Sequence, residues 1–302
     1  MITRTYSYKR IGSHEIRADV YCPDARSRAP VVLWLHGGGL IFGSRRDLGT
    51  LWGDHLQRYL ALGFVVVAPD YRLAPETKLD AIVEDVEDAY RWVRGIGPEL
   101  FGIDANRIAL VGHSAGGYLA LTAGWMFRPR PAALISFYGY ADVTRPWYTQ
   151  PSRHYSQEPA VPREAAFAAV GRAPISEPPS ENSRALFYLY CRQHGLWPTE
   201  VTGHDPGREV EWFDRFCPIR NVDRDYPPTL LVHGDRDTDV PFDESVRMAE
   251  ALALKKVPHD LVVISEGQHA FDVLQRDDPP VVAAMDRAAE FLKDHLDREV
   301  KE

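Results

Sequence analysis

The segment 112–117, with the sequence Gly-His-Ser-Ala-Gly-Gly, constrains the fold of this chain more than any other feature. It follows an apolar run at 107–111 and precedes a second apolar stretch at 118–123, so the pattern indicates a strand, a sharp turn and a helix. Glycines around Ser114 remove side chains that would collide in such a turn, and the hydroxyl would project at the carboxyl edge of a sheet. An isolated pattern of this kind also describes a serine that only caps a helix in a glycine-rich turn. The other segments of the chain distinguish between these two interpretations.

Length and composition describe an ordinary globular protein. The chain has 302 residues and is 45% hydrophobic, which is enough for a substantial core in one large domain or two smaller ones. The formal net charge of −8 argues against nucleic acid and anionic membranes as partners. The first ten residues lack the apolar segment of a signal peptide, so we expect a cytoplasmic protein. The three cysteines, Cys22, Cys191 and Cys217, show no metal-ligand spacing and predict free thiols, with a Cys191–Cys217 bridge as the alternative.

Strand and helix signals alternate along most of the chain. Two β-like segments joined at residues 12–13 predict an antiparallel hairpin at a sheet edge, and the later apolar runs predict strands buried on both faces. Together they indicate an α/β architecture with a mostly parallel, eight-stranded sheet flanked by helices. The predicted strands are 3–10, 14–22, 31–35, 64–68, 107–111, 132–138, 229–233 and 261–264, and the predicted helices include 47–62, 79–94, 242–255 and 280–296.

The alternation stops between residues 141 and 226. This stretch is rich in proline and aromatic residues, and we expect helices near 163–170 and 182–194. A connection of this length needs a core of its own or a surface to cover. We therefore predict a core made of residues 1–140 and 227–302, with 141–226 as an inserted helical lid over the carboxyl edge of the sheet. A helical subdomain remote from the chemistry is the alternative.

Three further stretches follow predicted strands and match what a serine nucleophile needs. Residues 36–39, His-Gly-Gly-Gly, leave backbone amides unshielded, as an oxyanion receptor or any tight loop requires. Residues 233–241 supply aspartates, and His269 follows the last strand. A serine hydroxyl is a weak nucleophile, so an imidazole must take its proton and a carboxylate must orient that imidazole. The order serine, aspartate, histidine is the order found in α/β-hydrolases.

With these features the chain resembles the α/β-hydrolase superfamily over nearly its whole length. Residues 36–39 and the segment 71–76, Tyr-Arg-Leu-Ala-Pro-Glu, resemble the hormone-sensitive-lipase-like carboxylesterases. The segment 233–241 looks more like the acid loop of acetyl-xylan/feruloyl-esterase-like and dienelactone-hydrolase-like relatives. Members of the first group usually carry an amino-terminal cap, whereas here the lid would be the insertion at 141–226.

The resemblance assigns a role to each candidate residue. It implies Ser114 as nucleophile, His269 as base and Asp237 as the orienting acid, with Asp235 and Asp239 as the alternative acids. The oxyanion donors would be the amides of Gly38, Gly39 and Ala115, with Gly37 as a substitute. We expect structural roles for His36, His113 and His233, no cofactor and no metal site.

The function implied is that of a serine carboxylesterase that hydrolyses small to medium carboxylic esters through an acyl-enzyme. The expected partner is a small-molecule ester, and the last helix, 280–296, is a candidate surface for a homodimer. Three alternatives share the fold. They are an acyltransferase, a peptidase of prolyl-oligopeptidase type and a small-molecule receptor without catalysis.

Overall fold

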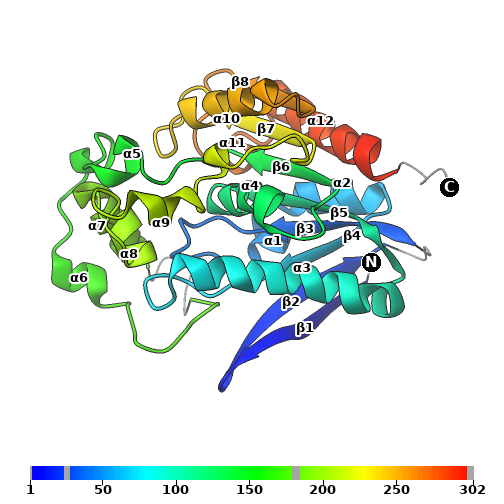
Figure 1. The fold of residues 1–302 in the computed structure, drawn as a ribbon, viewed down its shortest axis with the longest axis horizontal. Helices are drawn as coiled ribbons and strands as arrows, with labels where there is room; N and C mark the ends of the chain where they lie inside the picture. The colour runs from blue at the N-terminus through cyan, green and yellow to red at the C-terminus, as the bar shows by residue number, and fades with distance from the viewer. Residues whose placement is uncertain (1, 24–27, 179–183, 298–302) are drawn as a thin grey trace.

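One mixed sheet organises the protein. The computed structural model describes residues 2–23, 28–178 and 184–297, and Figure 1 shows their arrangement. The strand order in the sheet is β1-β2-β4-β3-β5-β6-β7-β8. The pairs β1/β2 and β2/β4 are antiparallel and the other five pairs are parallel, which confirms the predicted mostly parallel, eight-stranded sheet. The strands are β1 Ile2–Ile11, β2 His14–Cys22, β3 Ala29–Leu35, β4 Val65–Pro69, β5 Ile103–His113, β6 Ala133–Phe137, β7 Thr229–Gly234 and β8 His259–Ile264.

The central strands are apolar throughout because both of their faces are covered. In β3, Val31 and Leu33 belong to the hydrophobic core on one face of the sheet, while Val32 and Trp34 belong to the core on the other face. All four side chains are fully buried. Successive side chains of a strand point to opposite faces, so a strand between two helical layers has no position that favours a polar residue.

Helices cover both faces of the sheet. The helices α3 (Leu79–Phe101), α4 (Ala115–Met126) and α10 (Asp243–Leu254) pack on the first face, and Figure 1 shows α3 crossing in front of the strands. The opposite face carries α1 (Asp47–Thr50), α2 (Gly53–Ala61), α11 (Phe271–Leu274) and α12 (Pro279–Leu296). This is the two-layer covering that the alternating pattern predicts.

Two predicted helices differ from the structure. The helix predicted over 47–62 is broken between α1 and α2, where Trp52 has φ −109° and ψ 30°. The indole of Trp52 donates a hydrogen bond to the buried carboxylate of Asp272. The helix predicted over 79–94 instead continues to residue 101, through Pro98. Gly97 lets the last turns of the helix pack closely on Ile103, because a Cβ there would lie 2.5 Å from Ile103 Cδ1, and Gly102 ends the helix with a φ of +65°.

In its described residues, the insertion between β6 and β7 contains short helices joined by turns and irregular segments, and no strand. Figure 1 shows its helices gathered at one end of the sheet. The predicted helix 163–170 is shorter than expected, and the first residues of the predicted helix 182–194 lie outside the described residues. The elements are α5 (Pro146–Thr149), η1 (Tyr155–Gln157), α6 (Arg163–Phe167), α7 (Ala185–His194), α8 (Trp197–Thr202), α9 (Val210–Asp214) and η2 (Pro218–Arg220).

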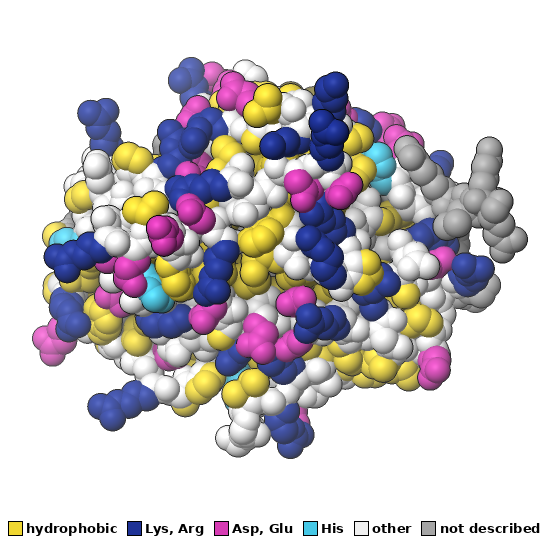
Figure 2. Space-filling model, viewed as in Figure 1, with side chains coloured by type: hydrophobic (Ala, Val, Ile, Leu, Met, Phe, Trp, Pro, Cys, Tyr) yellow, Lys and Arg dark blue, Asp and Glu magenta, His cyan; other side chains and the backbone are white. Residues whose placement is uncertain are grey.

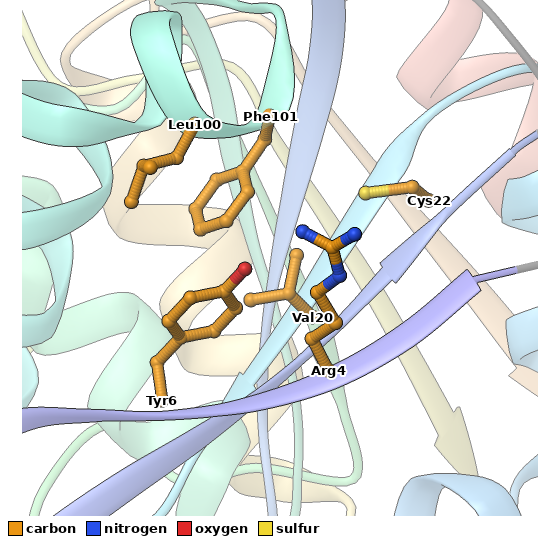
Figure 3. Close-up of a pocket in the computed structure, with 6 residues that line it drawn as sticks. All are labelled: Arg4, Tyr6, Val20, Cys22, Leu100 and Phe101. Carbon is orange, nitrogen blue, oxygen red and sulfur yellow. The ribbon is translucent and has the colours of Figure 1, made fainter.

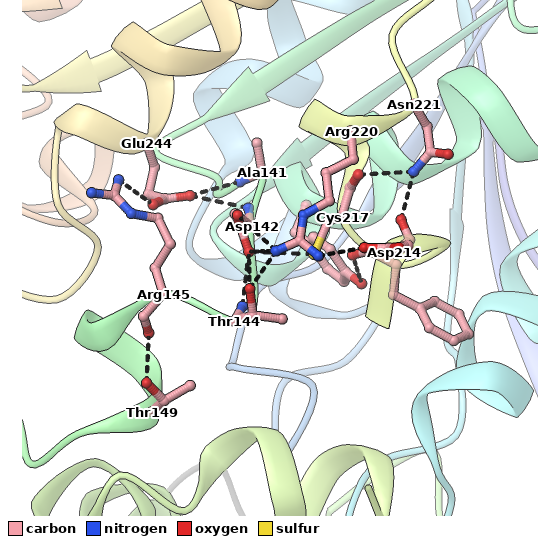
Figure 4. Close-up of polar contacts among 12 residues, drawn as sticks. Ala141, Asp142, Thr144, Arg145, Thr149, Asp214, Cys217, Arg220, Asn221 and Glu244 are labelled. Atoms are coloured by element: carbon pink, nitrogen blue, oxygen red, sulfur yellow. Dashed lines mark hydrogen bonds and ion pairs between the residues drawn. The ribbon is translucent and has the colours of Figure 1, made fainter. Parts of the chain in front are cut away.

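A polar network fastens both ends of the insertion to the core (Figure 4). The carboxylate of Glu244, on α10, accepts hydrogen bonds of 3.1 Å from the amides of Ala141 and Asp142 and one of 2.9 Å from Arg145. At the other end of the insertion, Arg220 donates to both oxygens of Asp142 at 3.2 Å. The two ends therefore meet at one polar cluster beside α10.

Two further observations concern membrane-spanning helices and the thiols. Within the described residues, no helix has the length and apolar character needed to cross a membrane. Acidic and basic side chains are interspersed on the face seen in Figure 2. Cys191 and Cys217 are buried free thiols, so the alternative disulfide between them is not formed.

Candidate active site

Ser114 lies in a strained turn between β5 and α4. Its backbone has φ 55° and ψ −116°, a conformation that a residue with a side chain rarely adopts. Its amide donates a hydrogen bond of 2.9 Å to Phe137 O at the end of the neighbouring strand β6. Strain of this kind persists only where the surrounding structure enforces it, and it is typical of functional sites.

The glycines around Ser114 are a steric requirement of this turn. A Cβ on Gly112 would lie 2.0 Å from Gly116 O, and a Cβ on Gly116 would lie 2.1 Å from Leu35 O. Both obstacles are backbone atoms, which cannot move aside as a flexible side chain can. The first turn of α4 therefore packs directly against β5 and β3, and this holds the hydroxyl at the strand ends.

Three predicted side chains form one hydrogen-bonded chain. Ser114 Oγ lies 3.1 Å from His269 Nε2, and His269 Nδ1 lies 2.7 Å from Asp237 Oδ2. They follow β5, β8 and β7, whose carboxyl ends share one edge of the parallel sheet. Because Nδ1–H donates to the carboxylate, the lone pair of Nε2 faces the serine hydroxyl. This arrangement can take a proton from Ser114 as the serine attacks an electrophile.

The Asp237 carboxylate is fixed by its own loop. Its Oδ1 accepts hydrogen bonds of 2.9 Å from the amides of Asp239 and Val240, and its Oδ2 lies 3.2 Å from His233 Nε2. Burial alone would raise the pKa of Asp237, but the charge of His269 and the hydrogen bonds from both histidines hold it well below its usual range. For His269, burial acts to lower the pKa, but the charges of Asp237 and Asp239 outweigh it and raise the pKa.

The two alternative acids lie elsewhere. Asp235 is exposed and accepts a hydrogen bond of 2.7 Å from the amide of Glu266. Asp239 approaches the opposite nitrogen of the imidazole, with Oδ2 at 3.6 Å from His269 Nε2. Of the three aspartates in this loop, the structure places only Asp237 at Nδ1.

The glycine loop, residues 36–39, lies beside Ser114. Gly38 and Gly39 line a cavity of about 170 Å³ together with Ser114 and His269. Within the described residues, the amides of Gly38, Gly39 and Ala115 donate to no backbone oxygen outside their own element. These open donors are what an oxyanion site needs. Gly37, the substitute donor, packs closely on β5, where a Cβ would lie 3.0 Å from His113 O.

The other strand-end histidines have structural contacts. His36 stacks on Tyr71 with ring centroids 4.0 Å apart, and its Nδ1–H donates to Gly37 O at 2.8 Å. Burial lowers the pKa of His36 to about 4. His233 bonds Ser245 Oγ at 2.7 Å. Both therefore order loops beside the site, as the sequence predicts.

The insertion supplies contacts that sequence reasoning left unspecified. Tyr188, on α7, lines the cavity and packs on Gly39, where a Cβ would lie 2.6 Å from Tyr188 Cε2. Trp197 Nε1 donates a hydrogen bond of 2.8 Å to Gly39 O, and Arg184 Nε donates one of 2.7 Å to Ile41 O. The aromatic density of 141–226 pointed to a packed subdomain, but nothing in the sequence showed which aromatic residue meets the glycine loop.

A buried polar cluster lies behind Ser114. His55 Nε2 donates a hydrogen bond of 2.9 Å to Asp272 Oδ2, and His113 Nε2 lies 3.0 Å from the same oxygen. Tyr138 OH donates to Asp272 Oδ1 at 2.7 Å, and Trp52 Nε1 donates to Oδ2 at 3.2 Å. The two histidines and Asp272 are close enough together to hold a metal ion. The carboxylate, however, is already surrounded by N–H and O–H donors, so this donor set fits a hydrogen-bonded cluster rather than a cation site.

A second cavity lies away from the serine. It also measures about 170 Å³, and Figure 3 shows its lining side chains between the β1–β2 hairpin and the end of α3. Its polar groups are Arg4, Cys22 and the Tyr6 hydroxyl, and burial raises the pKa of the Cys22 thiol. These groups supply no nucleophile with a paired base and acid.

Comparison with known proteins gives concordant results. A family described by its alpha/beta hydrolase fold matches residues 32–273. A non-reducing polyketide synthase from Penicillium rubens is 28% identical over 98% of this chain, which spans only 14% of that relative. An alpha/beta hydrolase superfamily protein from Enterococcus faecalis has a TM-score of 0.72 at 24% identity, covering 97% of this chain and 99% of that one. A hyperthermophilic esterase from Pyrobaculum calidifontis has a TM-score of 0.71 at 24% identity, covering 97% and 85%.

Proposed function

The chain belongs to the family with the alpha/beta hydrolase fold, and from this premise we propose that it is a serine carboxylesterase acting on small to medium carboxylic esters. One observation carries the proposal. Ser114, His269 and Asp237 form a continuous hydrogen-bonded chain of 3.1 and 2.7 Å whose serine end opens into a cavity beside unpaired amides.

The first half of the reaction acylates the serine. As Ser114 Oγ bonds to the ester carbonyl carbon, His269 Nε2 takes its proton and the carbonyl electron pair moves onto the oxygen. The amides of Gly38, Gly39 and Ala115 would donate hydrogen bonds to this oxyanion, each worth about 3 kcal/mol in the transition state. The carbon–oxygen bond to the alcohol then breaks, and Nε2–H gives its proton to the leaving oxygen. An acyl-enzyme remains.

The second half of the reaction hydrolyses the acyl-enzyme and regenerates the free hydroxyl of Ser114. His269 Nε2 accepts a proton from a water molecule as its oxygen attacks the acyl carbon. The tetrahedral intermediate uses the same amides, and its collapse returns the proton from Nε2 to Ser114 Oγ. Throughout, Asp237 holds the tautomer with Nδ1 protonated and stabilises the imidazolium. The net reaction consumes one ester and one water.

The volume and the walls of the cavity beside Ser114 favour small substrates. Its volume of about 170 Å³ and its aromatic walls, which include Phe42, Trp52 and Tyr188, favour a short acyl group over a long chain. The esterase from Pyrobaculum calidifontis shares the fold, and this supports ester hydrolysis as the general chemistry. The complete hydrogen-bonded chain favours catalysis over the receptor alternative.

The test is a hydrolysis scan with p-nitrophenyl acetate, butyrate and octanoate and a feruloyl ester. The wild type is compared with Ser114→Ala, His269→Ala and Asp237→Asn, and Asp235→Asn removes a charge from the exposed side of the same loop as the matched control. We expect kcat to fall by about 10³-fold or more in the three site variants and to stay near the wild-type value in the control. Wild-type turnover by Ser114→Ala would exclude the proposed nucleophile.

A further inference from the structure

A second carboxylate, that of Asp239, lies near Nε2 of His269, the nitrogen that faces Ser114. Asp239 lines the active-site cavity, and its Oδ2 lies 3.6 Å from His269 Nε2. The same nitrogen lies 3.1 Å from Ser114 Oγ. Asp237 occupies Nδ1, so Asp239 is not needed to orient the ring. It lies instead in the wall of the cavity that also contains Ser114.

The insertion holds this carboxylate in place. Tyr188 OH donates a hydrogen bond of 2.7 Å to Asp239 Oδ1, and Arg192 Nη1 donates to the same oxygen. Arg192 Nη2 also donates at 2.9 Å to the backbone oxygen of Asp239. The guanidinium is itself 2% exposed, with its Cζ about 5 Å from the ring centroids of Tyr148 and Tyr155. Both donors bind Oδ1, so Oδ2 is the oxygen directed at His269.

Arg192 pairs with Asp239 from outside the cavity, so the positive charge that offsets this carboxylate does not line the wall itself. Among the described residues that line it there is no lysine or arginine, and Asp239 is the single carboxylate. Phe42 and Trp52 are apolar neighbours in the same wall. A bound group with its own carboxylate would meet a like charge in this small space. A group with an N–H or O–H donor would gain a charge-assisted hydrogen bond.

The position of Asp239 relative to the chemistry says which part of the substrate it meets. His269 Nε2 must deliver its proton to the leaving oxygen, so the leaving alcohol lies against that nitrogen. An acceptor 3.6 Å from Nε2 is within reach of a donor only a few bonds from the leaving oxygen.

We propose that Asp239 selects esters whose leaving alcohol carries a hydrogen-bond donor near the scissile oxygen, a protonated amine above all. This inference rests on the proposed esterase function and names its substrate class as esters of amino alcohols.

The experiment compares two esters of similar shape, 2-(dimethylamino)ethyl acetate, which is protonated at neutral pH, and 3,3-dimethylbutyl acetate, which is uncharged. The readout is the ratio of their kcat/KM values within one enzyme preparation, which does not depend on the fraction of folded protein. We expect Asp239→Asn to lower this ratio about tenfold or more, because a hydrogen bond to a charged group is lost. Asp235→Asn removes the same formal charge from the exposed side of the loop and should keep the wild-type ratio.

Each other outcome has a defined meaning. An unchanged ratio in Asp239→Asn, whether both esters lose activity equally or neither does, would show that Asp239 does not select the leaving group, and it would overturn the inference. If the wild type hydrolyses no ester at all, the proposed function itself fails.

A measurement on the wild type alone covers the case in which Asp239→Asn does not fold. We expect 2-(dimethylamino)ethanol to inhibit p-nitrophenyl acetate hydrolysis at a concentration about tenfold lower than 3,3-dimethyl-1-butanol does. Equal inhibition by the two alcohols would contradict the selection by Asp239.

Discussion

Nε2 of His113 lies 3.0 Å from Oδ2 of Asp272, and this contact joins the residue before Ser114 to the segment that follows His269. Tyr138 extends the connection, since its hydroxyl donates to Asp272 while its ring meets His269 with centroids 4.8 Å apart. Trp34 Nε1 donates to His113 Nδ1 at 3.1 Å, which leaves Nε2 as the protonated nitrogen facing Asp272. Ser114 and His269 are therefore supported by one buried cluster beneath them.

Removing the centre of this cluster should destabilise the fold. Asp272→Ala leaves the donors of His55, His113, Trp52 and Tyr138 without their acceptor in a dry interior. We expect the free energy of unfolding to fall by about 3–5 kcal/mol, as measured by urea denaturation. Asp277→Ala, an exposed change on the same segment, is the control and should stay within about 0.5 kcal/mol of the wild type. A loss below 1 kcal/mol for Asp272→Ala would show that the cluster contributes little.

The pH dependence of activity should reflect the charges around His269. The imidazole must be neutral to accept the serine proton, and its pKa is raised above the ordinary value of 6.5 by Asp237 and Asp239. We therefore expect kcat/KM to rise with pH and to reach half its maximum above pH 6.5. In Asp239→Asn one raising charge is gone, so the midpoint should move to lower pH. A wild-type midpoint below 6.5 would contradict this assignment.

Stability should decline on mild acidification. Burial lowers the folded-state pKa of His36 and of His113 to about 4, from an ordinary value of 6.5. The unfolded chain therefore binds more protons between these two values, so stability is fully present above pH 6.5 and is lost as the pH falls toward 4. Each histidine contributes up to about 3 kcal/mol to this loss.

Thermal unfolding between pH 8 and pH 4 measures the effect. We expect Tm to be nearly constant at the alkaline end and to fall steadily below pH 6.5. His154→Gln, at an exposed histidine, should leave the profile unchanged. A Tm that stays constant from pH 7 to pH 5 would show that the buried histidines do not control acid stability.

Two glycine substitutions should have opposite effects. Gly116→Ala places a methyl group 2.1 Å from Leu35 O, so the turn must shift, and we expect a loss of several kcal/mol in stability together with loss of esterase activity. Gly95→Ala, on α3, meets no atom within 4 Å and should stabilise the protein by about 0.5–1 kcal/mol. Denaturant titration of both variants tests the comparison. An active, stable Gly116→Ala protein would refute the steric argument.

The sequence alone determined the features that depend on neighbouring residues. Hydrophobic runs between helical patterns predicted the mostly parallel sheet, because a strand covered on both faces must be apolar at every position. The glycines around Ser114 predicted the strained turn, because only a residue without a side chain fits between strand and helix there. The order of Ser114, the aspartate loop and His269, each after a strand, predicted their common edge.

The way in which distant segments meet depends on packing that no local pattern in the chain predicts. Three aspartates share one loop, and spacing alone could not show that Asp237 reaches Nδ1 while Asp239 faces Nε2, because a rotation of the loop exchanges them. The contacts of Tyr188 and Arg192 with Asp239 depend on how the insertion folds back over the sheet. The meeting of His55, His113 and Asp272 has no local signal either, since it arises from packing between α2, the nucleophile turn and the histidine loop. Hydrogen bonds among such remote residues form only once the core is closed, and no periodicity in the chain records them.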